Sequence, residues 1–504
     1  MLALAAILAA AAAPVVSPAP ERVALTLYRA PGRTPQDRMD LKSLGGFALV
    51  TETRTIDLPA GAAALRFEGV ADGIIPASAI VTGLPGGTIE KNRDAKLLSP
   101  LNLIDGTLGR EVTIRRTDRL TGRMREERAT IVAVPVGNVG SVVMRTPEGI
   151  ETWRCPGFPE KIIYDGAPPG LSAKPVLSVA TSSPRAARVT VTLSYLASGF
   201  DWSASYVATL APAGDQLDLF AWATLANANG QAFPQASVQA VAGRLQRRSD
   251  REILAAASML QLHCFRLGTT TSDLPVITPY QRHAIEAQDI GEIVVTGMRA
   301  PAITVSAPPA PPPPPLPPED LGDLKLYRVP EAVTVTPNAQ KQVALLVRAH
   351  VAFEKTYQIV LQPWQEDQVP ASIMLRIHDA GQKGLGIPLP SGTTALYQVR
   401  KGERLLLGLG TIGDMAKGER TRLAAGISHQ VIATQHIESE RRHVTLSNAN
   451  PFPVSVEVAI GPTGAPDYAK TSSRLERIDG VQTWRATLAA HAIAELAYSI
   501  KHED

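Results

Sequence analysis

Residues 188–196 of the sequence, RVTVTLSYL, alternate strictly between polar and apolar side chains. Successive side chains of a β-strand point to opposite faces, so this stretch has one apolar and one polar face. The apolar face consists of Val189, Val191, Leu193 and Tyr195. One buried face and one wet face are typical of antiparallel sheets, so the segment predicts a strand of such a sheet.

Strand-like segments lie on both sides of this one. They include residues 205–210, 216–225, 357–361 and 454–458. The 504 residues contain 41 Pro and 39 Gly but only 5% aromatic residues, a balance typical of short strands joined by turns. The chain is therefore predicted to be mainly β, with antiparallel β-sandwich domains.

A small separate unit is predicted at residues 104–167. Two Gly-containing pairs, Thr121-Gly122 and Glu148-Gly149, mark tight turns inside it. About five short strands in some sixty residues indicate a small closed barrel, similar to an SH3 domain. The strand-like segments are residues 111–115, 130–134, 141–145 and 161–164.

The remaining domain boundaries follow from breaks in the strand pattern. Residues 21–103 are predicted to form an N-terminal β domain, and residues 168–248 and 324–504 one interrupted β-sandwich. The insert begins with a predicted helix at 249–268, because Ser249 and Glu252 form a capping box ahead of apolar residues at helical spacing. It continues as a disordered proline-rich linker at 269–323, in which Pro308–Pro318 contains nine prolines.

The N-terminus predicts export from the cytoplasm. An Ala/Leu/Ile-rich run follows Met1; it is too short to span a bilayer but is typical of a signal peptide, although no Lys or Arg precedes it. We interpret residues 1–20 as a signal peptide, with small residues near Ala10–Ala12 as a cleavage site. No later apolar stretch reaches membrane length. The mature chain is therefore expected in the periplasm, or peripheral to the envelope, of a Gram-negative bacterium, with no transmembrane helix.

Charge and cysteine content limit the kinds of partner. The formal net charge is only +3, and the basic runs, such as Arg247-Arg248, are short, so no nucleic-acid partner is predicted. Cys155 and Cys264 could form a disulfide in an oxidising compartment, or remain two isolated thiols. Spacing alone leaves both alternatives open.

Sequence motifs for chemistry are weak. Gly408–Gly413 matches G-x-G-x-x-G, but no helical pattern follows, so we interpret it as a glycine-rich β-turn and not as a nucleotide site. His436, Glu438 and Glu440 would share one face of a strand, whereas His443 would fall on the other. No H-E-x-x-H motif occurs, and both features disfavour a metal site. We assign no catalytic residue, metal ligand or cofactor, and an enzyme is less expected than a binding protein.

One short segment of the predicted linker is typical of a partner-binding strand. It consists of Glu292, Ile293, Val294, Val295, Thr296 and Gly297. An extended apolar strand without its own sheet is suited to pairing with the sheet edge of a partner, or with the edge of this protein's own sandwich. The segment resembles the TonB-box-like segment of outer-membrane TonB-dependent receptors of alphaproteobacteria. That resemblance implies a TonB-like envelope protein as partner.

Four longer stretches carry a second resemblance. They are similar to the C-terminal domain of unknown function of bacterial mucoidy-inhibitor-A-like proteins. The resemblance implies an exported β-sandwich without an established activity, and it supplies no site residues. A coiled-coil pattern precedes the domain in longer members, and this chain lacks one. The stretches are residues 193–210, 225–243, 327–346 and 447–458.

Two functional hypotheses follow. The first is a structural or protein-binding envelope protein that acts through its β-sandwich and linker strand. The second is an envelope hydrolase or carbohydrate-active protein with site residues on loops. An enzyme predicts a concave pocket where carboxylates or histidines converge, whereas a binding protein predicts exposed sheet edges or apolar patches.

Overall fold

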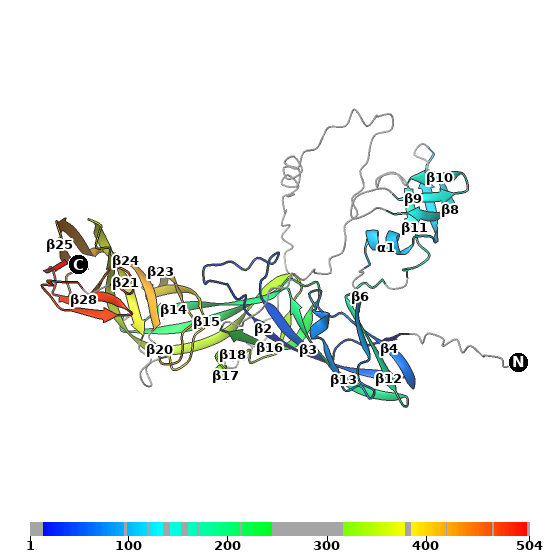
Figure 1. Cartoon of the computed structure of the whole chain (residues 1–504), viewed down its shortest axis with the longest axis horizontal. Coiled ribbons are helices and arrows are strands. Elements are labelled where there is room, and N and C mark those ends of the chain that lie inside the picture. The colour runs from blue at the N-terminus through cyan, green and yellow to red at the C-terminus, as the bar shows by residue number, and fades with distance from the viewer. Residues whose placement is uncertain are drawn as a thin grey trace, which may run out of the picture. The chain divides into compact units, whose positions relative to one another are not determined.

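The computed structural model contains two compact units made mainly of β-strands (Figure 1). The first unit comprises residues 1–93, 176–254 and 313–504, and the second comprises 94–175 and 255–312. The predicted mainly β fold, built from antiparallel sheets, is thereby confirmed. The structure describes residues 14–94, 98–117, 121–134, 142–152, 160–168, 171–211, 214–243, 316–377, 385–419, 421–465 and 468–500.

Three sheets make up the described part of the first unit. The first contains β17 (Glu319–Leu321), β18 (Leu324–Arg328), β16 (Phe233–Ala242), β2 (Arg22–Tyr28), β3 (Phe47–Leu58), β13 (Ala187–Ser198) and β5 (Ile80–Thr82), with β19 (Val333–Val335) paired to β16. The second contains β1 (Val15–Val16), β4 (Gly61–Glu68), β12 (Val176–Ser183) and β6 (Glu90–Asp94). A short 3₁₀ turn, Pro76–Ser78, precedes β5.

The third sheet is the largest. Its main path runs through β23 (Glu403–Ile412), β22 (Gly392–Arg400), β14 (Phe200–Leu210), β15 (Gln216–Asn227), β20 (Ala339–Leu361), β21 (Gln368–Ile377), β24 (Thr421–Glu438), β25 (Arg441–Asn448) and β29 (Ile493–Ser499). Beside this path, β26 (Val454–Ile460) pairs with β20 and β28 (Val481–Leu488), and β27 (Leu475–Ile478) pairs with β28.

The strand predicted at residues 188–196 is confirmed as β13. It pairs with β3 along its whole length in antiparallel register. Its predicted inward residues Val191, Leu193 and Tyr195 are fully buried in the first hydrophobic core. This core therefore forms where the alternating faces of β3 and β13 meet those of β4 and β12.

A single long strand, β20, contributes to both hydrophobic cores of the first unit. Residues 339–352 pair with β15, and residues 353–361 pair with β21 and β26. Leu346 and Val351 belong to the first core, whereas Tyr357 and Ile359 belong to the second. The two cores are therefore linked by one continuous strand.

The same asparagine corner occurs twice in the first unit. Asn227, the last residue of β15, accepts hydrogen bonds from the backbone N–H and side-chain amide of Asn229 at 3.0 and 3.1 Å. Asn448, the last residue of β25, receives the same two bonds from Asn450, both at 3.0 Å. A Phe-Pro pair follows each corner, Phe233-Pro234 and Phe452-Pro453. This repeat was not predicted from the sequence.

The described part of the second unit is a five-stranded antiparallel sheet with one short helix. Helix α1 (Pro100–Gly106) begins after Ser99, whose hydroxyl accepts from the Asn102 backbone N–H at 3.2 Å. In the described residues the sheet is open, with β10 and β11 at its two edges, and so differs from the closed barrel expected. The strand order is β10 (Gly149–Thr152), β9 (Val143–Thr146), β8 (Met124–Ala133), β7 (Glu111–Thr117) and β11 (Glu160–Ile163). Within the described ranges, no helix has the length and apolar content needed to cross a membrane.

Three expected boundaries differ from the structure. Strand β2 pairs in parallel with β16, so the residues predicted as a separate domain at 21–103 share a sheet with later segments. Strand β17 lies within the predicted linker at 269–323, and β1 lies within the predicted signal peptide at 1–20. The predicted helix at 249–268 lies outside the described residues.

Alkaline pH is expected to destabilise the first unit. Burial raises the pKa of Tyr195, Tyr206, Tyr327 and Tyr498, so these phenols stay protonated in the folded chain above pH 10. Their unfolded pKa is near 10, so their contribution is complete below that pH and is lost above it by about 1.4 kcal/mol per tyrosine per pH unit. Urea unfolding from pH 8 to 11 measures this, and a flat profile would contradict it. Tyr206→Phe should reduce the slope of the unfolding free energy against pH by about 1.4 kcal/mol per pH unit, the contribution of one tyrosine.

Candidate functional site

An apolar face covers one side of the strands β15, β14, β22 and β23. Phe220 of β15 lies opposite Val207 of β14, Val207 lies beside Ala395 of β22, and Ala395 lies opposite Leu409 of β23. The inward neighbours on these strands, such as Ala204, Ala221 and Leu396, are buried in the core, so this row faces outward. We define the apolar face as Val207, Phe220, Trp222, Ala395, Tyr397, Leu406 and Leu409.

The apolar face is open to solvent and rich in aromatic residues. Leu409 is 71% exposed and Leu406 is 52% exposed. Phe220 and Trp222 form an edge-to-face pair with ring centroids 4.6 Å apart. The guanidinium of Arg404 lies 5.9 Å from the Tyr397 ring centroid. Trp, Tyr and Arg are the residues most enriched at the energetic centres of protein interfaces.

Strand β23 also offers a free edge. It is the last strand in its sheet, and no strand of the described residues pairs with its outer side. Residues 405–412, LLLGLGTI, contain no charge, although natural edge strands usually carry charges that prevent pairing with other chains. An uncharged strand at the end of a sheet is suited to accepting an additional strand from another chain.

Residues 408–412 of the glycine motif lie in strand β23, with Gly413 directly after it, and not in the β-turn that was expected. A β-carbon on Gly408 would lie 3.1 Å from the carbonyl oxygen of Ala424, and one on Gly410 would lie 3.0 Å from the Ala424 Cβ. Glycine at these positions lets β24 pack closely against the inner face of β23. The motif thus serves strand packing, and no helix follows it.

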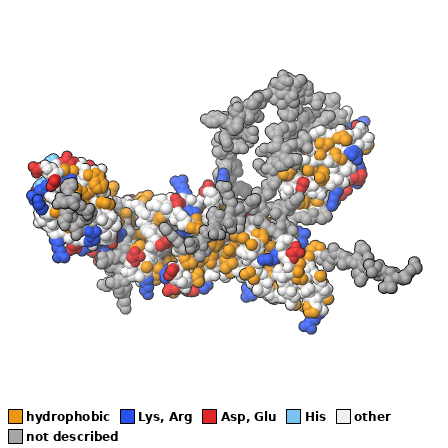
Figure 2. Space-filling model, in the orientation of Figure 1, with side chains coloured by type: hydrophobic (Ala, Val, Ile, Leu, Met, Phe, Trp, Pro, Cys, Tyr) orange, Lys and Arg blue, Asp and Glu red, His pale blue; other side chains and the backbone are white. Residues whose placement is uncertain are grey.

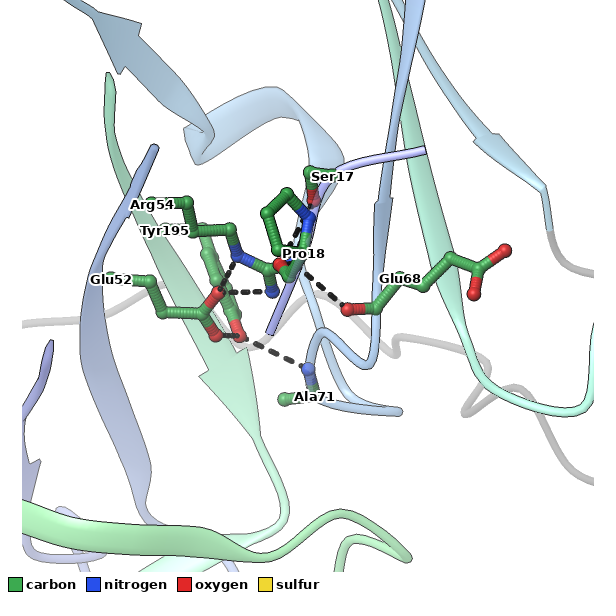
Figure 3. Close-up of polar contacts among 7 residues, drawn as sticks. All are labelled: Ser17, Pro18, Glu52, Arg54, Glu68, Ala71 and Tyr195. Atoms are coloured by element: carbon green, nitrogen blue, oxygen red, sulfur yellow. Dashed lines mark hydrogen bonds and ion pairs between the residues drawn. The ribbon is translucent and has the colours of Figure 1, made fainter. Parts of the chain in front are cut away.

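A buried ion pair occupies the first core (Figure 3). Arg54 donates to Oε2 of Glu52 from Nε at 3.0 Å and from Nη2 at 2.5 Å, with both side chains at most 1% exposed. Tyr195 donates to Oε1 of Glu52 at 2.9 Å and accepts from the Ala71 backbone N–H at 3.1 Å. The cluster thus joins β3, β13 and the loop that follows β4.

A polar groove of about 550 Å³ lies beneath the loop between β2 and β3. Arg29 fixes the loop through two hydrogen bonds to Asp414, at 2.8 and 2.6 Å, and buried Asp201 forms an ion pair with Arg33. Hydrogen bonds from Thr34 keep the pKa of Asp37 below its usual value. Asp37 is the one carboxylate among the described lining residues, so the groove lacks a pair for general acid–base catalysis.

Two described histidines face each other on neighbouring strands. His443 lies directly opposite His436 across the β24–β25 hairpin, so the prediction that they fall on different faces is wrong. His436 Nδ1 lies 2.7 Å from a Glu366 carboxylate oxygen. Among the described residues, no group of three His, Cys, Asp or Glu side chains could hold a metal.

The partner-binding segment predicted at Glu292–Gly297 lies outside the described residues, as do Cys155 and Cys264. Charged side chains of both signs are interspersed on the face shown in Figure 2.

No protein-family model matches the chain, and no curated protein sequence is significantly similar to it. The candidate site therefore depends on geometry alone, and its best-defined feature is the apolar face with the free edge of β23.

Proposed function

We propose that this chain is an exported cell-envelope protein that binds another protein through the apolar face and the free edge of β23. The occupant is an extended, apolar and uncharged strand of the partner. The uncharged edge at residues 405–412 supports this choice, because a charged strand would lose hydration there without gaining an opposite charge. The partly buried Trp222 and Tyr397 supply the flat contact area beside that edge.

Export is supported by the apolar run that follows Met1. Cleavage near Ala10–Ala12 would leave β1 in the mature chain. That position agrees with the contacts of this segment, because Val15 and Val16 pair with β4 and the Ser17 hydroxyl accepts from Arg54 at 2.8 Å.

The single observation that carries the proposal is the exposed leucine edge. A photocrosslinking amino acid at position 409 is expected to capture one partner in living cells, with the crosslink mapped to an extended apolar segment. Leu406→Lys added to this chain should reduce capture at least tenfold, because a charge on the face must be desolvated on binding. The yield of the mapped crosslink, measured by mass spectrometry, checks this.

Position 493 provides the matched control. Ile493 is 66% exposed on β29, the strand at the opposite end of the same sheet. The same crosslinker at 493 should not capture that partner. Equal capture from both positions, a crosslink to a folded polar surface, or a crosslink from 409 to β23 of a second copy would each overturn the proposal, the last in favour of self-association.

A further inference from the structure

Strand β23 also exposes leucines on the side of its sheet away from the apolar face. Leu405 precedes the outward-facing Leu406 and pairs with Gln398 of β22, so its side chain points to the other side of the sheet. Leu405 is nevertheless 44% exposed. Leu407, the extra residue of a β-bulge, is 36% exposed. The exposed leucines of β23 are therefore not confined to the apolar face.

Ile427 of β24 extends this other side. A β-carbon on Gly426 would lie 3.1 Å from the carbonyl oxygen of Leu407, so the next residue, Ile427, lies close to that leucine. Ile427 is 63% exposed. Strand β24 packs against the inner face of β23, so Ile427 lies on the side of β23 away from the apolar face. We define the second patch as Leu405, Leu407 and Ile427.

A strand that pairs with β23 would lie between two apolar surfaces. Successive side chains of the added strand point alternately to the two sides of the sheet. One set would meet Leu406 and Leu409 of the apolar face, and the other set would meet the second patch. Because the gain from burial grows with the apolar area removed from water, apolar side chains at every position of the added strand are favoured over alternating ones.

The hairpin turn at one end of this edge is basic. Residues 400–404, which lead from β22 into β23, contain two Arg and one Lys against one Glu, and all of them are exposed. Within the described part of the chain, Arg400 and Lys401 form no ion pair. Residues 405–412 carry no charge, so the positive charge is confined to one end of the edge. A carboxylate at that end of a partner's strand would meet an opposite charge.

We propose that the partner's strand is apolar on both faces and is flanked by a carboxylate at the end beside residues 400–404. This inference rests on the proposed function, because it gives the chemistry of the strand that pairs with β23. A strand with one polar face is disfavoured, since its polar side chains would lose hydration against the second patch without gaining a hydrogen-bond partner. A flanking lysine is disfavoured by repulsion from the basic turn.

The test is a titration of fluorescently labelled peptides with the full chain, followed by anisotropy. The two-faced peptide is a stretch of Val and Ile between two Asp residues, and in the one-faced peptide Thr replaces every second residue of that stretch. The two-faced peptide should bind roughly tenfold more tightly, because only it covers the second patch with apolar side chains. Replacing both Asp by Lys should weaken binding about threefold at low salt, and this difference should shrink at high salt.

Three variants separate this inference from the proposed function. Ile427→Ser should weaken binding of the two-faced peptide about fivefold and leave that of the one-faced peptide unchanged. Leu406→Lys should weaken binding of both peptides, because the apolar face contacts both. Ile493→Ser is the matched control, since Ile493 is 66% exposed on β29 and its substitution should affect neither peptide.

The possible failures are distinguishable. Equal binding of the two peptides, with both weakened by Leu406→Lys, would overturn the inference and leave the proposed function standing. Equal binding of the Asp and Lys versions at low salt, or equal effects of Ile427→Ser and Ile493→Ser, would overturn the inference in the same way. Binding of neither peptide, or binding that Leu406→Lys does not change, would overturn the proposed function as well.

Discussion

Replacing Arg54 by Met is expected to lower the free energy of unfolding of the first unit by about 3–5 kcal/mol, because the Glu52 carboxylate would remain buried without its counter-ion. The guanidinium also donates from Nη1 to the Ser17 hydroxyl at 2.8 Å and to the carbonyl oxygens of Pro18 and Glu68, both at 3.0 Å. The substitution would therefore release the segment before β2 from its contacts with Arg54. It would also leave the Glu52 carboxylate buried without an opposite charge. Urea unfolding monitored by circular dichroism measures the change.

The double variant Glu52→Leu/Arg54→Met is the control. With both charges removed, no uncompensated charge is buried, so the double variant should be more stable than Arg54→Met alone. Additive losses from the two substitutions, or a loss below about 1 kcal/mol for Arg54→Met, would show that solvent reaches the pair and that the burial of Arg54 is not what stabilises this core.

The same ion pair shows where sequence patterns stop being informative. Strand β13 could be predicted because every inward position is apolar. Strand β3 has the same geometry, but two of its inward positions are Glu52 and Arg54, so its apolar alternation is interrupted between Val50 and Ile56. Local alternation shows only which residues are apolar. Whether a charged side chain is buried depends on an opposite charge that only the folded chain brings close to it.

The candidate site was hidden for the opposite reason. Residues 405–407 are three leucines, a pattern equally consistent with a strand buried on both faces, and the sequence offers no sign that β23 lies at an edge. Sheet order depends on long-range pairing, such as that of β14 with β22, which are far apart in the chain. The asparagine corner, by contrast, is visible in the sequence itself, because Asn-Ala-Asn occurs at both 227–229 and 448–450.

The repeated corner carries the second large prediction. Asn227 donates from its amide to the carbonyl oxygens of Gln231 and Thr336 at 3.0 and 3.1 Å, and Asn448 donates to those of Phe452 and Ala489 at 3.0 and 2.8 Å. Asn227→Asp keeps the size of the side chain but removes both donors and buries a charge against two carbonyl oxygens. A loss of about 3–5 kcal/mol is expected, and Asn448→Asp should cost a similar amount.

The pH dependence of these variants separates charge from geometry. A protonated Asp can donate to one of the two carbonyl oxygens, so part of the lost stability should return on acidification, whereas Asn227→Ala should show no such recovery. Asn338→Asp is the matched control, because Asn338 is exposed in a turn with φ of 47°, a conformation that Asp also tolerates. If Asn227→Asp and Asn338→Asp lose equal stability in urea at neutral pH, the corner does not hold the strands together. If only the corner variants lose stability, one local motif fixes the exit of a strand in both cores, since each amide joins its own turn to a carbonyl of a distant segment.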